Sequence, residues 1–296
     1  MKKLLFNTLF FIVFILILEF IACVVLWGRY APAIATAIKS GDSISDFFKL
    51  RHFDIKNDES YYRSPIIKKN DKKSILVFGC SVAYGDGLSD EQTFSAKLSE
   101  LTHRSVYNRA LGGLGPQVML YHFQTGKVLE LAKDVDYVIY VYIYDHIFRN
   151  LKFRNFPFLY HYHVRYVFDY EKKLKMQILN PYLAYSSLFK LYEHSMPTLR
   201  GVEYTENLFY KVIEESYKKS QEFYPNSKFI LFDYSYDGVP LKEKLEKLGI
   251  SVISLSDLTD INVETVDYWN SEFDTHPNEK AWDLLTPLLI KKINII

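Results

Sequence analysis

Cysteine is scarce in this chain, and charge of either sign is not in excess. Only two cysteines, Cys23 and Cys80, occur among 296 residues, and Cys23 lies in an apolar run that would keep it away from the folded domain. A framework of disulfides is therefore excluded. Lys and Arg total 36 against 35 Asp and Glu. Because no basic surplus points towards a polyanion, nucleic-acid binding is not expected.

Several signals of other function classes are absent as well. The sequence has no internal repeat, no low-complexity tract and no glycine-rich phosphate loop. His161 and His163 alternate with aromatic residues and would share one side of a strand, which suggests a metal site. No carboxylate or third histidine stands at ligand spacing, so a surface or packing role is favoured. We expect neither a metal nor an organic cofactor.

The longest apolar run stands at the amino end. Leu4 to Trp27 reads LLFNTLFFIVFILILEFIACVVLW, interrupted only by Asn7, Thr8 and Glu19. About 20 such residues suffice to cross the hydrocarbon core as a helix, and a cleaved signal peptide has a shorter run of roughly 7–15 residues. The run predicts a retained single-pass membrane anchor over residues 1–28. A carboxylate is costly in lipid, so Glu19 is expected either to face a partner helix or to be tolerated in a long span.

Charges on either side of the run indicate its orientation. Lys2 and Lys3 precede it, while Arg29 and Lys39 follow. This modest bias favours a cytoplasmic amino terminus and an extracytoplasmic position for the rest of the chain. Two alternatives are a lipoprotein cleavage site over Phe20 to Cys23 and a buried amphipathic helix. The apolar residues that continue after the cysteine argue against the first, and near-continuous hydrophobicity argues against the second.

After a polar connector over residues 29–73, short apolar runs alternate with segments of helical spacing. Strands are predicted at 74–78, 106–107, 136–143, 228–233 and 250–255, and helices at 91–101, 117–132, 206–223, 240–248 and 277–293. Alternation of this kind predicts an α/β domain over residues 74–296, with a parallel sheet covered on both faces. The alternation stops at about 146–205, where an aromatic-rich insertion without obvious regular structure is interpreted as a cap or small subdomain.

Candidate catalytic residues stand near both ends of this domain. Ser81 follows the first predicted strand, at the carboxyl edge where ligands of α/β sheets bind. A serine nucleophile needs a base and donors for an oxyanion. Asp274 and His276 are too close in sequence to face each other on a helix, and Pro277 keeps His276 out of the helical conformation. On a loop before the last helix, His276 can act as general base while Asp274 supports its imidazole.

Three motifs together resemble the SGNH/GDSL hydrolase family. Gly79 to Ser81 is similar to the opening Gly-Asp-Ser, and Asp274 to Pro277 is similar to a shortened form of the closing Asp-x-x-His-Pro block. Asn108 to Gly115 resembles the second block, an Asn followed by a glycine-rich turn. The resemblance covers roughly residues 74–293. It implies a flavodoxin-like three-layer α/β/α sandwich, preceded here by one transmembrane helix.

The resemblance also implies a catalytic triad and an oxyanion hole. The triad would consist of Ser81, Asp274 and His276. The backbone amides of Ser81 and Gly113 would donate to the oxyanion. Where the family has Gly-x-Asn-Asp after the third strand, this chain has Tyr142 to Asp145, so Tyr144 replaces the asparagine that would be the third donor. Loss of one donor lowers the rate of other hydrolases on the order of 100-fold.

The function implied is that of an extracytoplasmic serine esterase. It would act through an acyl-enzyme on acylated small molecules or on O-acyl groups of cell-envelope glycans. Two alternatives remain: an O-acyltransferase of envelope polysaccharide that uses the same triad, and a catalytically silent binding or scaffold protein, suggested by Tyr144. Plainer structural interpretations also exist, with Ser81 and Asp274 as helix caps and Gly112 to Gly115 as formers of a tight turn.

Overall fold

The computed structural model describes residues 7–8, 10–25, 62–68, 73–151, 164–178, 183, 186–236 and 238–295. Most of the predicted connector and part of the insertion lie outside these residues, as do both ends of the predicted anchor. His161 and His163 also lie outside them.

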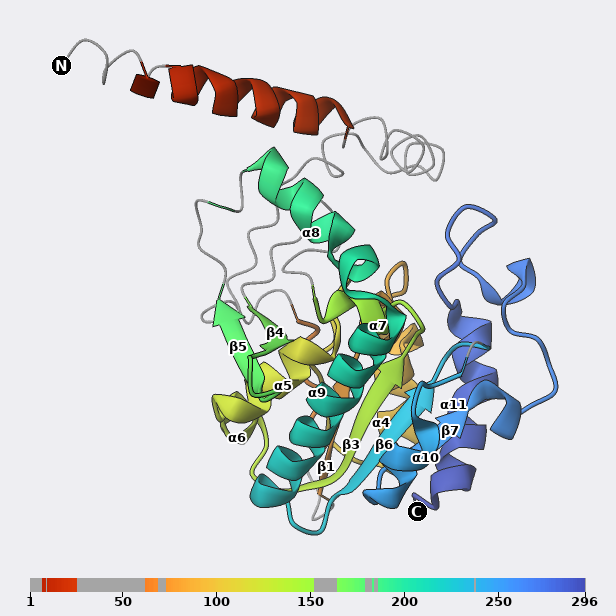
Figure 1. Ribbon diagram of the computed structural model, residues 1–296. Helices are drawn as coiled ribbons and strands as arrows, with labels where there is room; N and C mark the ends of the chain where they lie inside the picture. Colours follow the sequence, from red (N-terminus) through yellow and green to blue (C-terminus); the bar gives the residue numbers. More distant parts are fainter. Residues whose placement is uncertain are drawn as a thin grey trace.

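A five-stranded parallel sheet forms the centre of the domain (Figure 1). Its strands are β1 (Ser74–Phe78), β2 (Val106–Asn108), β3 (Val135–Tyr142), β6 (Lys228–Asp233) and β7 (Ser251–Ser254). Their order is β2-β1-β3-β6-β7, which is the order of flavodoxin-like folds. The chain therefore reverses its direction of travel across the sheet between β1 and β3, and ligand sites of such sheets lie at that point.

Helices cover both faces of this sheet. One face packs against α4 (Phe94–Thr102) and α11 (Glu279–Ile293), and the other against α5 (Pro116–Gln124), α9 (Val202–Phe223) and α10 (Lys242–Lys247). Successive side chains of β1 alternate between the two cores: Ile75 and Val77 pack in the first, Leu76 and Phe78 in the second. The predicted parallel sheet with helices on both faces is confirmed.

The observed helices differ in their bounds from the sequence prediction, and for two of them the cause is local. The helix expected at 117–132 is split into α5 and α6 (Lys127–Leu131), because Gly126 between them adopts the left-handed conformation with φ 71°. The last helix begins at Glu279 rather than at Pro277, since the side chain of Asn278 caps it by accepting a hydrogen bond from the amide of Ala281 at 3.1 Å.

The insertion contains regular structure that its sequence did not reveal. After the short helix α7 (His146–Arg149), β4 (Val164–Phe168) and β5 (Leu174–Ile178) form an antiparallel hairpin, followed by α8 (Ser187–Arg200). The carboxylate of Asp169 accepts hydrogen bonds from the amides of Glu171 and Lys173, each at 2.9 Å, and so stabilises the turn of the hairpin. The described part of this segment therefore contains a hairpin and helices that its sequence pattern did not indicate.

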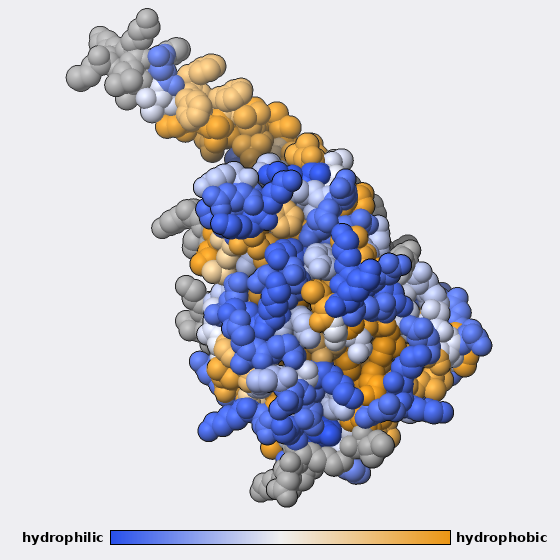
Figure 2. All heavy atoms as spheres, turned by 60° about the horizontal axis from the view of Figure 1, so that its bottom comes forward, coloured by the Kyte–Doolittle hydropathy of each residue, from blue (hydrophilic) through white to orange (hydrophobic). Residues whose placement is uncertain are grey.

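A separate helix over residues 10–25 exposes most of its large apolar side chains. Figure 2 shows it as an apolar rod that extends from a largely hydrophilic body. Glu19 on this helix caps the amino end of α8: its carboxylate accepts from the amides of Ser187 at 2.6 Å and Leu188 at 3.2 Å. The carboxylate of Glu19 is thus paired with a helix of the same chain. None of the helices in the described residues has both the length and the apolarity needed to span a bilayer.

We expect Gly79→Ala to destabilise the link between β1 and the short helix α3 (Ser81–Tyr84). Gly79 has φ 152°, and a Cβ there would lie 2.8 Å from Cβ of Ala83 and 2.9 Å from the carbonyl oxygen of Val141. Overlap and backbone strain together should lower the free energy of unfolding by about 2–4 kcal/mol. The measurement is urea denaturation followed by circular dichroism.

Gly126→Ala is the matched control for this substitution. Gly126 also has a positive φ, 71°, but no atom lies within 4 Å of a Cβ built on it. Backbone strain alone should then lower the free energy of unfolding by about 1–2 kcal/mol. Equal losses in the two variants would show that the close approach of β3 to Gly79 contributes nothing.

Candidate active site

Ser81 is the first residue of α3 and lies at the carboxyl edge of the sheet. The amides of the first helical turn have no partner within their own helix, so the amide of Ser81 is placed where a helix binds negative charge. The carbonyl oxygen of Ser81 accepts from the amides of Gly85 at 2.9 Å and Asp86 at 3.1 Å. The buried side chain of Asn108 donates to the carbonyl of Ala83 at 2.8 Å. The carbonyl groups of Ser81 and Ala83 in α3, the nucleophile helix of the predicted triad, are thus held by hydrogen bonds from residues outside the helix.

The three residues of the predicted triad meet at this edge. Nε2 of His276 lies 2.8 Å from Oγ of Ser81, although the two residues are 195 positions apart in the sequence. Nδ1 of His276 lies 2.5 Å from Oδ1 of Asp274. The backbone amide of His276 donates to the same carboxylate oxygen at 3.1 Å. A continuous hydrogen-bonded path therefore joins the hydroxyl to the carboxylate through the imidazole.

A closed loop explains how two residues so near in sequence can face each other. Trp269 forms an antiparallel bridge with Pro277, and the amide of Asn270 donates to the carbonyl of His276 at 3.0 Å. This pairing closes a tight turn that contains Asp274. The prediction of a loop before the last helix is confirmed, and backbone pairing is what gives the loop its shape.

Asn270 is a site residue that sequence reasoning missed. Its side-chain amide donates to Oδ2 of Asp274 at 3.1 Å and to the carbonyl of Asp86 at 2.8 Å. One amide group therefore connects the triad carboxylate to the loop that follows the nucleophile helix. Nothing in the sequence marks this asparagine, because it stands in a polar loop among other hydrogen-bonding residues.

Charge stabilises a protonated imidazole in this site. Burial lowers the pKa of His276, but the hydrogen bond to Asp274 and the charges of Asp86 and Asp274 outweigh burial, so the pKa lies above its ordinary value. Burial raises the pKa of Asp274, but hydrogen bonds from His276 and Asn270 outweigh it and bring the pKa below the ordinary value. Both shifts favour an imidazolium beside a carboxylate, which is the charge pair that a general base produces.

The turn that contains Gly113 lies between β2 and α5, at the same edge of the sheet, and Gly113 has φ 71°. Arg149 of α7 donates through Nη1 to the carbonyl of Leu114 at 3.0 Å and through Nε to the carboxylate of Asp145 at 2.6 Å. The guanidinium thereby fastens the glycine turn to the loop after β3. Its charge acts on His276 in the direction that lowers the pKa, against the larger opposing effects.

Tyr144, at the position of the third oxyanion donor, packs its ring edge-on against Phe148 with centroids 5.8 Å apart. In the part of the chain that the structure describes, its hydroxyl makes no hydrogen bond with the triad. The described residues contain no group of three or more His, Cys, Asp or Glu side chains that could hold a metal ion.

No protein-family model matches this sequence, and no curated protein matches it either. Solved structures of similar shape include an acetyl xylan esterase from Butyrivibrio proteoclasticus, at 11% identity and a TM-score of 0.47, over 78% of this chain and 66% of that one. An esterase from Pseudoalteromonas sp. matches at 14% identity and a TM-score of 0.43, over 75% of this chain and 97% of that one. A member of the lipolytic protein G-D-S-L family from Veillonella parvula matches at 13% identity and a TM-score of 0.41, over 75% of this chain and 99% of that one. These TM-scores lie below 0.5, so the function proposed below rests on the chain's own geometry.

We expect kcat/KM for a short acyl ester to rise with pH through an apparent pKa above 6.5, the ordinary histidine value. A general base must be neutral, so activity is lost as pH falls below the raised pKa. Asp274→Asn removes one of the two carboxylates that raise this pKa. The apparent pKa of the variant should therefore fall below that of the parent, and kcat should drop on the order of 10³–10⁴-fold. Initial rates between pH 5 and 9 give both profiles, and a parent midpoint at or below 6.5 would contradict the assignment of His276 as the titrating base.

We expect Asn270→Ala to lower kcat about 10-fold with little change in KM, because the triad carboxylate loses one of its hydrogen bonds and rotates more freely. Asn262→Ala is the control, since Asn262 caps an exposed turn by accepting from the amide of Glu264 at 2.9 Å. Steady-state kinetics of both variants make the comparison. An unchanged kcat in Asn270→Ala would contradict a role for Asn270 in the site.

Proposed function

We propose that this chain is a serine esterase of the SGNH/GDSL type that acts through an acyl-enzyme. The observation that carries the proposal is the hydrogen-bonded path from the hydroxyl of Ser81 through His276 to Asp274. A serine hydroxyl, an imidazole and a carboxylate in this order form the arrangement that activates a nucleophile on several unrelated folds. The pKa directions of His276 and Asp274 support the same roles.

The reaction has two steps. Oγ of Ser81 attacks the ester carbonyl carbon while Nε2 of His276 takes its proton. The tetrahedral adduct collapses, the bond to the alcohol oxygen breaks, and the imidazolium returns the proton to the leaving alcohol. Water then attacks the acyl-enzyme, His276 takes a proton from it, and the carboxylic acid leaves as Ser81 regains its proton. Asp274 stays ionised throughout and stabilises the imidazolium.

Backbone amides supply the oxyanion hole in this proposal. The amide of Ser81 lies at the amino end of α3, where helix geometry favours negative charge. The amide of Gly113 in the turn before α5 is the second donor. With a tyrosine packed on Phe148 in place of the family's asparagine, the third donor is missing, and turnover is expected to be slower than in an enzyme with three donors.

The proposal extends to location and substrate. The apolar run from residue 4 to residue 27 belongs to a membrane anchor, and the catalytic domain lies on the extracytoplasmic side. The exposed apolar side chains of the helix over residues 10–25 support the membrane anchor. Acylated small molecules and O-acylated glycans of the cell envelope are the substrates within reach of such an enzyme. Water as acceptor gives an esterase, and a sugar hydroxyl as acceptor gives an O-acyltransferase with the same triad.

Labelling of the detergent-solubilised full chain with a small fluorophosphonate tests the proposal. The parent should become covalently labelled, Ser81→Ala should not, and His276→Ala should react at least about 100-fold more slowly because the general base is missing. Ser251→Ala is the control, since Ser251 is an exposed serine at the start of β7, at the opposite edge of the sheet. Equal labelling of the parent and Ser81→Ala would refute the nucleophile, and a folded parent that neither labels nor hydrolyses esters would support a silent binding protein.

A further inference from the structure

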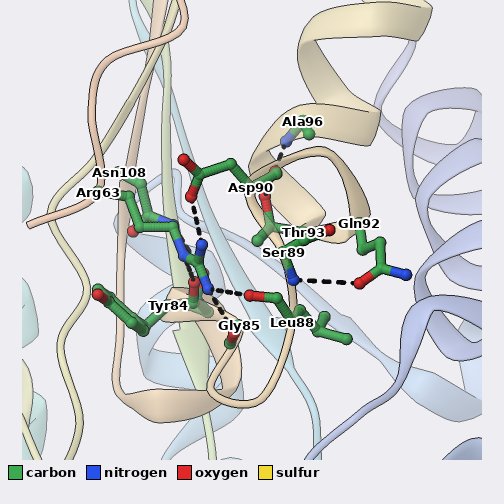
Figure 3. Close-up of polar contacts among 11 residues, drawn as sticks. Arg63, Tyr84, Gly85, Leu88, Ser89, Asp90, Gln92, Thr93, Ala96 and Asn108 are labelled. Carbon is green, nitrogen blue, oxygen red and sulfur yellow. Dashed lines mark hydrogen bonds and ion pairs between the residues drawn. The ribbon is translucent and has the colours of Figure 1, made fainter.

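A cation from outside the sheet contacts the turn that follows the nucleophile helix. Arg63 lies in residues 62–68, a segment that precedes β1. Its guanidinium donates to the carbonyl oxygens of Tyr84 at 2.7 Å, Gly85 at 2.7 Å and Leu88 at 2.8 Å (Figure 3). The remaining nitrogen pairs with the carboxylate of Asp90. All three guanidinium nitrogens are therefore engaged, and three of the four hydrogen bonds go to one short stretch of backbone.

These carbonyls belong to the same turn as the backbone of Ser81. The helix α3 has only four residues, and Gly85 ends it with φ 83°. The amides of Gly85 and Asp86 donate back to the carbonyl of Ser81. Carbonyls at the end of a helix lack intrahelical partners and carry partial negative charge, which a guanidinium stabilises. A tilt of this turn would move Ser81 with it, because the amides of Gly85 and Asp86 in the turn are hydrogen-bonded to the carbonyl of Ser81.

The guanidinium is itself held in place. Its side chain is 13% exposed, and its Cζ lies 4.7 Å from the ring centre of Tyr84. The segment that bears it is fixed by two backbone hydrogen bonds between Ile66 and Val106, at 3.0 and 2.9 Å, and by a contact of 2.9 Å between the hydroxyl of Tyr62 and Nε2 of His122. Arg63 is thus attached to the domain independently of the turn that it contacts.

The same turn also accepts from Asn270, which donates to the carbonyl of Asp86 and to the triad carboxylate. The turn from Tyr84 to Leu88 therefore accepts hydrogen bonds from two side-chain donors. One donor, Asn270, is also hydrogen-bonded to Asp274 of the triad. The other, Arg63, belongs to the segment that precedes β1. Arg63 is the one that donates to the carbonyls of Tyr84 and Gly85, at the end of the nucleophile helix.

We propose that Arg63 is a positioning residue that sets the orientation of Ser81 towards His276, an inference that rests on the esterase function proposed above. Arg63→Ala should lower kcat about 100-fold, the effect of a nucleophile misplaced by roughly 1 Å. KM should change less than about threefold, because the substrate-binding surface is intact. Arg63→Lys should recover kcat to within about 10-fold of the parent, since an ammonium keeps the charge but lacks the planar fork.

Arg104→Ala is the matched control. Its side chain is 10% exposed and pairs with Asp136, donates to the carbonyl of Lys73 at 3.2 Å, and lies 5.5 Å from the ring centre of Tyr137. The environment of Arg104 resembles that of Arg63, but Arg104 lies at the amino ends of the strands, away from Ser81. We expect this variant to keep the parent kcat per folded molecule. Equal losses of kcat in the two arginine variants would overturn the proposal.

Amide hydrogen exchange of residues 81–88 in the full chain gives a second measurement that needs no enzymatic activity. Arg63→Ala should speed exchange of the amides of Gly85 and Asp86 about 10-fold or more, and Arg104→Ala should leave it unchanged. Unchanged exchange in Arg63→Ala would overturn the proposal, and so would faster exchange with an unchanged kcat. Ester hydrolysis that persists in Ser81→Ala would instead show that the assignment of Ser81 as the nucleophile had failed, while the exchange data would still decide whether Arg63 holds the turn.

Discussion

The close passage of Gly79 beside β3 is the constraint on which the site depends. A side chain at this position would overlap the carbonyl of Val141 and Cβ of Ala83. The absence of a side chain lets β1 pass directly into α3, so that Ser81 starts a helix at the edge of the sheet. From there the hydroxyl of Ser81 can reach the imidazole of His276, whose loop lies near the carboxyl end of the sequence. A bulkier residue would force β1 and β3 apart before any catalytic group was placed.

The interaction between His276 and Asp274 is that of a general base with its supporting carboxylate rather than that of a stabilising ion pair. His276 and Asp274 are only half-buried, with side chains 34% and 32% exposed, so their interaction is screened and adds little to stability. Its effect lies instead in orientation, because the carboxylate accepts from both Nδ1 and the backbone amide of His276. These two bonds leave Nε2 directed at Ser81. The loop therefore preorganises the tautomer that a general base requires.

The sequence predicted those parts of the fold that depend on local pattern. Buried strands such as β3 are apolar, β-branched and aromatic throughout, and their alternation with helices predicted the parallel sheet. The triad was predictable because a strand followed by Ser81 and an Asp-x-His-Pro loop each have a local signature. Asn270, Arg63 and the hairpin β4–β5 were not predictable in this way. Their roles arise from contacts between segments distant in sequence, and an arginine that binds backbone carbonyls has no motif.

The substitution at Tyr144 shifts the demand for precision onto the backbone. In a site with an asparagine donor, one oxyanion contact is a side chain that can adjust its rotamer. In the oxyanion hole proposed here the remaining donors would be the amides of Ser81 and Gly113, whose positions follow rigidly from α3 and from the turn before α5. Each of these elements accepts a hydrogen bond from an arginine: the carbonyl of Tyr84 in α3 from Arg63, and the carbonyl of Leu114 beside the glycine turn from Arg149. Because a backbone donor cannot adjust its position, an oxyanion hole made of two amides needs such supports more than one made of three groups would.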